Sequence, residues 1–158
     1  MQYQQNTKDK TVSSIKDFLT NDHRVCDELF AEMEQVASKG VLKDAQEMYE
    51  RFSEATEHHF QMEERVMFPE FEQKTGMVQG PTQIMRHEHQ QIRSLLKQMG
   101  EAIEKDDTRK FFGLTETVMI MLQQHNMKEE QMLYNMAQQH LSADADRIVM
   151  MMESMVTQ

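Results

Sequence analysis

The chain has 158 residues, a formal net charge of −10 and one cysteine, Cys26. A chain of this length is typically one domain, so we expect a single domain over residues 1–158. The negative charge argues against nucleic-acid binding, because phosphates require a basic surface. One cysteine excludes an internal disulfide and a metal site made of several thiolates.

The chain begins with a polar segment, MQYQQNTKDK, which lacks the apolar stretch of a secretory signal. No later run of about 18 apolar residues is long enough to span a membrane. We therefore expect a cytoplasmic protein, and the lone cysteine agrees with a reducing compartment. Glycine and proline are scarce and helix-forming residues are abundant, which predicts an all-α fold.

Two helices are predicted in the first half of the chain, over about residues 12–38 and 41–68, separated by a turn at Gly40. The apolar stripe of the first consists of Leu19, His23, Cys26, Phe30 and Met33. That of the second consists of Phe52, Ala55, His59, Glu63 and Val66. The stretch from Pro69 to Pro81 contains residues that break helices, so the second helix should end before it. The longest connection is expected from Phe71 to Gly80.

The third predicted helix begins at Pro81, since proline suits a first helical position. Its stripe consists of Met85, His89, Ile92, Leu96, Met99 and Ile103. The fourth spans about residues 108–138 with Asp107 as its cap. Its stripe consists of Val118, Met121, Leu122, His125, Glu129, Met132 and Met136. We interpret most of the 17 methionines as core residues rather than as metal ligands.

A short fifth helix is predicted over about residues 142–157, with Ile148, Met151 and Met155 on its apolar side. The four long amphipathic helices over about residues 12–138 are joined by short turns. This pattern predicts an up-down-up-down four-helix bundle with a short extra C-terminal helix.

The two halves of the chain form an internal repeat with an offset of 66 residues, from His23 to His89 and from His59 to His125. In each half an acid–His pair is followed, 36 residues after its histidine, by a His-x-x-x-Glu-Glu motif. The midpoints between successive histidines are residues 41, 74 and 107, in or beside predicted turns. Since a hairpin that folds at its midpoint brings its ends to one height, all four histidines should lie in one layer.

Two glutamates join this layer, because His59 and Glu63 share a helix face, as do His125 and Glu129. Buried carboxylates are almost never unpaired, and cations would balance them. Imidazole with carboxylate favours iron, manganese or zinc over calcium. The repeat therefore predicts two metal ions, each with two histidines, bridged by Glu63 and Glu129.

One histidine on an apolar stripe is usually a satisfied core residue, but four at one level are poorly explained that way. We expect His58 to face a groove or solvent, and His87 and His140 to lie on the surface. Five acidic residues could support imidazole N–H groups, but we favour solvated helix charges. They are Asp22, Asp27, Glu64, Glu88 and Glu130.

Residues 59–69, HFQMEERVMFP, resemble the HFxxEExxLFP signature of hemerythrin-like (HHE cation-binding) domains. Residues 125–134, HNMKEEQMLY, resemble its second copy, and the acid–His pairs at 22–23 and 88–89 resemble two further elements. The resemblance covers about residues 12–138. It implies a non-haem centre of two iron ions, joined by an oxo or hydroxo bridge, with manganese or zinc as substitutes.

Oxygen-carrying hemerythrins have HxxxH on the third helix and HxxxxD on the fourth. In this chain Arg93 stands four residues after His89, and the fourth helix carries HxxxE, from His125 to Glu129. The pattern is closer to bacterial members with four histidines and two glutamates. Some of these repair iron centres, but they carry an extra domain with paired cysteines. Asn135 also replaces the usual proline of the second signature copy.

The resemblance first implies a binding protein for dioxygen, nitric oxide or peroxide, in sensing, storage or oxidative and nitrosative stress protection. A second interpretation is a di-iron enzyme that removes peroxide or nitric oxide, and a third is an iron donor for repair. We favour binding over catalysis, because no flavin or iron–sulfur motif supplies electrons. Tyr49 or Tyr134 could serve redox chemistry, but we interpret both as packing residues. We expect a monomer or a homodimer.

Overall fold

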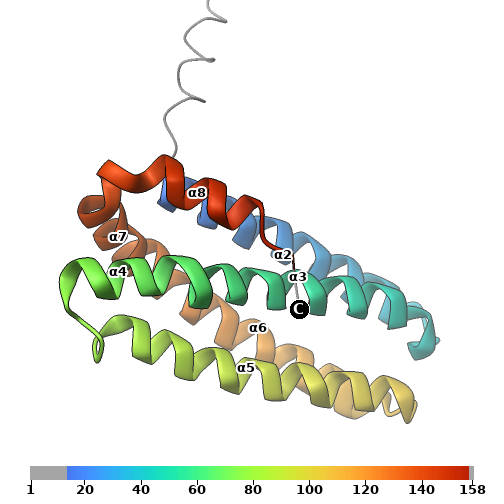
Figure 1. Cartoon of the computed structure of the whole chain (residues 1–158). Helices are drawn as coiled ribbons and strands as arrows, with labels where there is room; N and C mark the ends of the chain where they lie inside the picture. Colours follow the sequence, from blue (N-terminus) through green and yellow to red (C-terminus); the bar gives the residue numbers. More distant parts are fainter. Residues whose placement is uncertain (1–13, 157–158) are drawn as a thin grey trace, which may run out of the picture.

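The computed structural model describes residues 14–156, and within this range the chain is helical with no strand (Figure 1). The α-helices are α2 (Ile15–Ala37), α3 (Gln46–Met62), α4 (Phe68–Thr75), α5 (Pro81–Glu104), α6 (Thr108–Lys128), α7 (Tyr134–Leu141) and α8 (Ala145–Glu153). Two π-helical turns, η2 (Glu63–Met67) and η3 (Glu129–Leu133), join α3 to α4 and α6 to α7. Short 3₁₀ turns, η1 (Leu42–Ala45) and η4 (Ser142–Asp144), precede α3 and α8.

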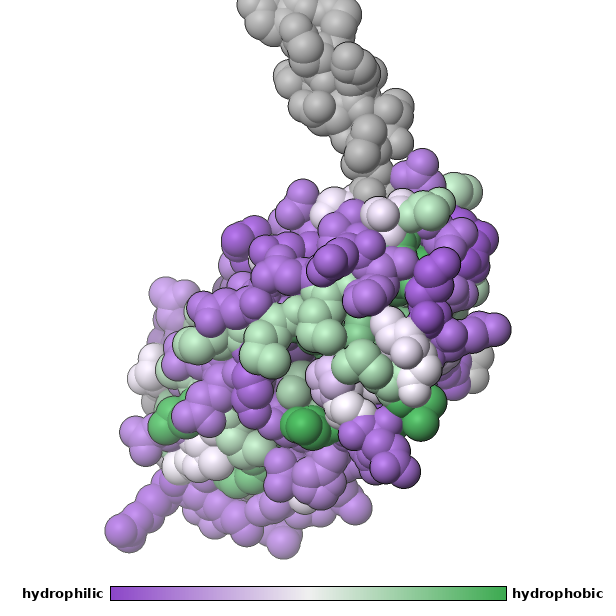
Figure 2. All heavy atoms as spheres, turned by 90° about the vertical axis from the view of Figure 1, so that its left-hand side faces the viewer, coloured by the Kyte–Doolittle hydropathy of each residue, from purple (hydrophilic) through white to green (hydrophobic). Residues whose placement is uncertain are grey.

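The predicted bundle is confirmed: α2 packs beside α3, α5 packs beside α6, and α4 packs against α7 (Figure 1). The chain therefore runs up and down through two continuous helices and two composite ones, and α8 returns to pack on α2 and η2. None of the helices between residues 14 and 156 combines the length and hydropathy needed to cross a membrane. At the end of the bundle shown in Figure 2 the surface is mostly hydrophilic, with apolar side chains between the polar ones.

Local signals explain where the helices begin. The Ser14 hydroxyl accepts a hydrogen bond from the Asp17 backbone N–H at 3.0 Å, which caps α2. Asp107 caps α6 in the same way through the Lys110 N–H at 3.1 Å, and Pro81 is the first residue of α5, both as predicted. The expected start near residue 12 and end near residue 157 lie outside the described residues.

The predicted helix break at Pro69 is wrong, because the composite helix continues to Thr75 and ends at Gly76, whose φ is 76°. Pro69 has no N–H, so a carbonyl one turn earlier loses its helical donor. In the π register that carbonyl belongs to Glu64, and the Arg86 guanidinium donates to it at 3.4 Å. The connection to α5 is therefore shorter than predicted, from Gly76 to Gly80.

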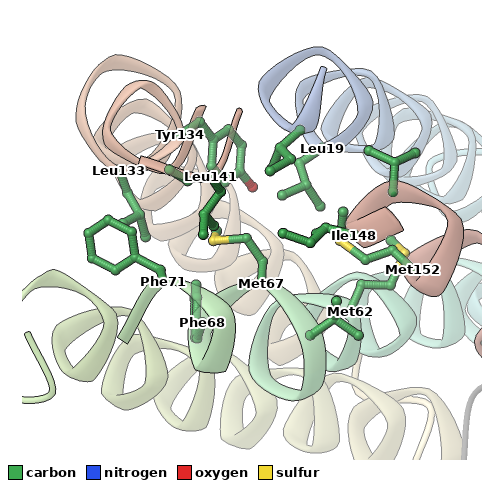
Figure 3. Packing of buried hydrophobic residues seen from close by; sticks show 14 of the residues in the cluster. Leu19, Met62, Met67, Phe68, Phe71, Leu133, Tyr134, Leu141, Ile148 and Met152 are labelled. Carbon is green, nitrogen blue, oxygen red and sulfur yellow. The ribbon is translucent and has the colours of Figure 1, made fainter. Parts of the chain in front are cut away.

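Two apolar clusters fill the bundle, one on each side of a polar layer. The cluster at the α4–α7 end is shown in Figure 3, which labels Leu19, Met62, Met67, Phe68, Phe71, Leu133, Tyr134, Leu141, Ile148 and Met152. The cluster at the opposite end contains Phe30, Met33, Phe52, Ile92, Leu96, Met99 and Phe111, among others. α2, α5 and the two composite helices thus each pass from one apolar cluster, through the polar layer, to the other.

The π turn in the fourth helix shifts the buried face by one residue relative to the prediction. Met132 was expected inside but is 58% exposed, whereas Leu133 is 2% exposed and Ala137 is buried. A π turn inserts one extra residue into the helical repeat, so every later residue changes face. In α8, Met152 rather than Met151 is buried beside Ile148.

This shift predicts that Leu133→Ala and Met132→Ala differ sharply in stability. Removing the buried Leu133 side chain should lower the free energy of unfolding by about 2–5 kcal/mol. Removing the exposed Met132 side chain should change it by no more than about 0.5 kcal/mol. Urea unfolding followed by circular dichroism measures both, and a larger loss for Met132→Ala would contradict the π turn.

Candidate metal centre

The six predicted site residues meet in the polar layer between the two apolar clusters. His23 comes from α2, His59 from α3, His89 from α5 and His125 from α6, and the π turns η2 and η3 supply Glu63 and Glu129. All six side chains are buried, with at most 3% of each residue exposed. The predicted common level of the four histidines is therefore observed.

The six residues form two groups that share the glutamates. One group consists of His23, His59, Glu63 and Glu129, and the other of Glu63, His89, His125 and Glu129. In each group the four donor atoms lie within 4.8 Å of one another. A single small cation can be reached by four donors at such separations.

Each glutamate directs one oxygen to each group. Glu63 Oε2 lies 3.3 Å from His59 Nε2, and Glu63 Oε1 lies 3.0 Å from His89 Nε2. Glu129 Oε1 lies 3.0 Å from His23 Nε2, and Glu129 Oε2 lies 3.4 Å from His125 Nε2. Both carboxylates therefore have the orientation of bridges between two cation positions.

The other ring nitrogen of each of the four site histidines contacts a carboxylate on a neighbouring helix. The Nδ1 pairs are His23 with Glu130 at 2.7 Å, His59 with Asp22 at 2.8 Å, His89 with Glu64 at 2.6 Å, and His125 with Glu88 at 2.8 Å. The interpretation of these four acids as solvated helix charges is thus wrong. Only Asp27 of the five is exposed as expected. Each of the four is next to a site residue in the sequence. Its side chain therefore starts close to the polar layer and can reach an imidazole on the neighbouring helix.

These outer carboxylates fix the orientation of the imidazoles. A carboxylate accepts hydrogen bonds, so Nδ1 carries the hydrogen and donates it. In a neutral ring this leaves the lone pair on Nε2, which faces the centre of the layer. The same carboxylate–histidine arrangement orients histidine ligands in metal sites.

Arg93, at the position where oxygen carriers have a further histidine, does not enter the site. Its Nη1 donates to Glu64 Oε2 at 3.0 Å and its Nε to Glu57 Oε1 at 2.8 Å, and its guanidinium lies 5.3 Å from the centre of the Phe60 ring. Burial raises the pKa of Glu64, but His89 and Arg93 outweigh burial and lower it. Arg93 therefore holds Glu64 as the charged acceptor for His89.

The charges in the layer strongly perturb one another. Burial lowers the pKa of His59, but Glu63 and Asp22 outweigh this and raise it well above its usual range. The same balance, with Glu129 as the main carboxylate, raises the pKa of His125 to about 9. Burial raises the pKa of Glu63, but His59 and His89 outweigh burial and bring it well below its usual range. The cluster thus favours positive charge at its centre.

The donor atoms fit a pair of cations. In the second group, Glu63 Oε1, His89 Nε2, His125 Nε2 and Glu129 Oε2 are buried without a hydrogen-bond partner among the described residues. His89 Nε2 and Glu63 Oε1 are only 3.0 Å apart, yet they do not meet hydrogen-bond geometry, as expected for two donors aimed at a common ion. Among residues 14–156 no lysine or arginine is buried to balance the glutamates. Buried polar atoms are normally satisfied, so a cation is the natural partner.

Tyr134, which was predicted to be a packing residue, is a further candidate for a functional role. It is fully buried, and its hydroxyl lies among the donor atoms of the first group. Burial, together with Glu129 and Glu63, raises its pKa well above the usual range. The repeat aligns Tyr134 with Phe68, so only one half of the chain has a hydroxyl at this position. This difference is the sequence feature that could have identified Tyr134.

The remaining histidines lie where they were predicted. His87 and His140 are exposed. His58 is half-buried, and its Nε2 lies 3.2 Å from the carbonyl of Met155, two residues beyond the end of α8, so it contacts the C-terminal segment rather than the polar layer.

A family model described as the hemerythrin HHE cation binding domain matches residues 14–137. The match begins at the cap of α2 and ends within α7, so it contains all six residues of the polar layer. Comparisons with curated proteins and with solved structures found no significant match.

Replacing Asp22 with asparagine should weaken metal binding by roughly 10–100-fold, because the His59 ring loses its charged acceptor. Asp27→Asn is the matched control, since Asp27 lies on the same helix but is exposed. Competition titration of each variant against a chelator measures the affinity. Equal affinities in the two variants would show that the outer carboxylates do not support the site.

Burial raises the pKa of the Cys26 thiol to about 11, against a smaller opposing effect of the His59 imidazole. The thiolate is the reactive form, so alkylation of the folded protein by iodoacetamide should be slow at pH 8 and rise until about pH 11. The urea-unfolded chain should react like a free thiol, whose pKa is about 8.5. If the alkylation rate of the folded protein stopped rising near pH 8.5, the pKa of a free thiol, the predicted effect of burial on Cys26 would be wrong.

Proposed function

The chain belongs to the hemerythrin HHE cation-binding family and is a metal-binding, hemerythrin-like protein, and on that premise we propose that it holds two iron ions. His23 and His59 bind the first ion, His89 and His125 bind the second, and Glu63 and Glu129 bridge them. The proposed role is to bind dioxygen, nitric oxide or peroxide, for sensing, storage or protection against oxidative and nitrosative stress.

The observation that carries this proposal is the divided orientation of the two glutamates. Each sends one oxygen towards a histidine of the first group and the other towards a histidine of the second, over 3.0–3.4 Å. A single cation bound by one group would leave the other oxygen of each carboxylate facing the second pair of histidines without a cation. Two histidines and two bridging oxygens at each position supply the mixed nitrogen and oxygen donors that suit iron, with manganese or zinc as substitutes.

The surroundings limit what could reach the ions. The donor residues are almost fully buried, and apolar clusters lie on both sides along the bundle. A surface cleft lined by Ile92, Gln124 and Lys128 reaches His125 on one flank. These features support a ligand of only a few atoms.

Reduced iron would supply electrons and a coordination position for such a ligand. The protein's own contribution is to hold four imidazoles in one tautomer through the outer carboxylates and to exclude bulk water. We propose binding, rather than repeated turnover, as the role of this centre.

Iron content and visible spectra of the purified protein, in air and after anaerobic reduction, test this proposal. We expect two irons per chain and near-ultraviolet bands that bleach on reduction and change when nitric oxide is added. His59→Ala and Glu129→Ala should lose bound iron, because each removes a donor. His87→Ala is the matched control, since His87 is exposed and should leave the iron content unchanged.

If the wild-type protein stays free of iron after reconstitution, the proposal is wrong. Repeated consumption of peroxide or nitric oxide would instead favour an enzyme. Transfer of the iron to an acceptor protein would favour a donor.

A further inference from the structure

The π turn η3 places the Tyr134 side chain in the polar layer. Tyr134 follows Glu129 by five residues, and its backbone N–H bonds the Glu129 carbonyl. In an unbroken α-helix a residue five positions on lies about 140° around the axis, since there are 3.6 residues per turn. The wider turn brings Tyr134 back to the face of Glu129, so its side chain enters the polar layer.

The Tyr134 hydroxyl lies within hydrogen-bonding distance of every donor atom in the first group. It is 2.5 Å from Glu63 Oε2 and 2.9 Å from Glu129 Oε1. It is also 3.1 Å from His23 Nε2 and 3.2 Å from His59 Nε2. A hydroxyl has one hydrogen to donate and two lone pairs that accept, so ordinary hydrogen bonds account for at most three of these four contacts.

These distances are those between neighbouring ligands of one ion. Bonds to small divalent ions are about 2.0–2.1 Å, so ligands at right angles are roughly 3.0 Å apart and opposite ligands roughly 4.2 Å apart. Within the first group the separations are 3.0 Å for His23–Glu129, 3.3 Å for His59–Glu63 and 4.0 Å for His59–Glu129. The hydroxyl is thus placed as a fifth vertex, adjacent to all four donors.

The second group has no such oxygen. The repeat puts Phe68 in the position of Tyr134, and its ring stacks on His89 with centres 5.8 Å apart. The four donors of the second group are those without a hydrogen-bond partner among the described residues, whereas all four of the first contact Tyr134. The two halves therefore differ at one atom that faces the metal.

We propose that the phenolic oxygen of Tyr134 is a fifth protein ligand of the ion held by His23, His59, Glu63 and Glu129. This inference rests on the proposed two-metal function. The hydroxyl proton is released to solvent as the ion binds, because a bound cation favours the deprotonated ligand. The two ions are then chemically different, and the second has one protein donor fewer.

The test compares ferric wild-type protein with Tyr134→Phe, which restores the phenyl group that the other half has. Ligation predicts a visible phenolate-to-iron charge-transfer band and resonance-enhanced tyrosine ring vibrations in the wild type. Both should vanish in Tyr134→Phe while circular dichroism stays unchanged. Tyr49→Phe is the control, because its hydroxyl donates to the Leu96 carbonyl at 2.6 Å, away from the metal layer, and should keep both signals.

The outcomes separate this inference from the function on which it rests. Wild-type protein that binds two irons without tyrosine signals, or signals that survive in Tyr134→Phe, would overturn the ligand role alone. Wild-type protein that binds no iron would overturn both. Signals lost in Tyr134→Phe and kept in Tyr49→Phe would establish the ligand.

Discussion

Burial of the Glu63 and Glu129 carboxylates is the constraint on which the centre of this bundle depends. Both side chains are fully buried, and among residues 14–156 no lysine or arginine is buried beside them. Removing an ionised carboxylate from water is costly unless a positive partner is close. In the metal-free protein the raised pKa values of His59, His89 and His125 favour protonated rings that supply this charge. In the proposed loaded form the cations supply it.

The four outer carboxylates orient the imidazoles in pairs that follow the internal repeat. Asp22 holds His59 as Glu88 holds His125, and Glu64 holds His89 as Glu130 holds His23. Each bond crosses between helices, so the interactions that orient the rings also tie the bundle together at the polar layer. The apolar clusters on either side keep the layer dry, which strengthens every charge interaction in it.

The common level of the four histidines could be predicted because it follows from chain geometry alone: equal spacing about short turns places His23, His59, His89 and His125 together. The π turns could not, because they depend on tertiary packing rather than on local propensity. Their extra residue places Leu133 rather than Met132 in the core and brings Tyr134 into the polar layer. The role of the outer carboxylates could not be predicted either, because whether a charged side chain next to a site residue is exposed or paired depends on which side chains the neighbouring helix presents to it.

The most direct test of this account is a crystal structure of the iron-loaded protein with an anomalous difference map at the iron absorption edge. The account predicts two iron peaks, one beside His23 and His59 and the other beside His89 and His125. Glu63 and Glu129 should each contribute one oxygen to both peaks. A single peak, or iron bound only at surface carboxylates, would contradict the two-metal centre.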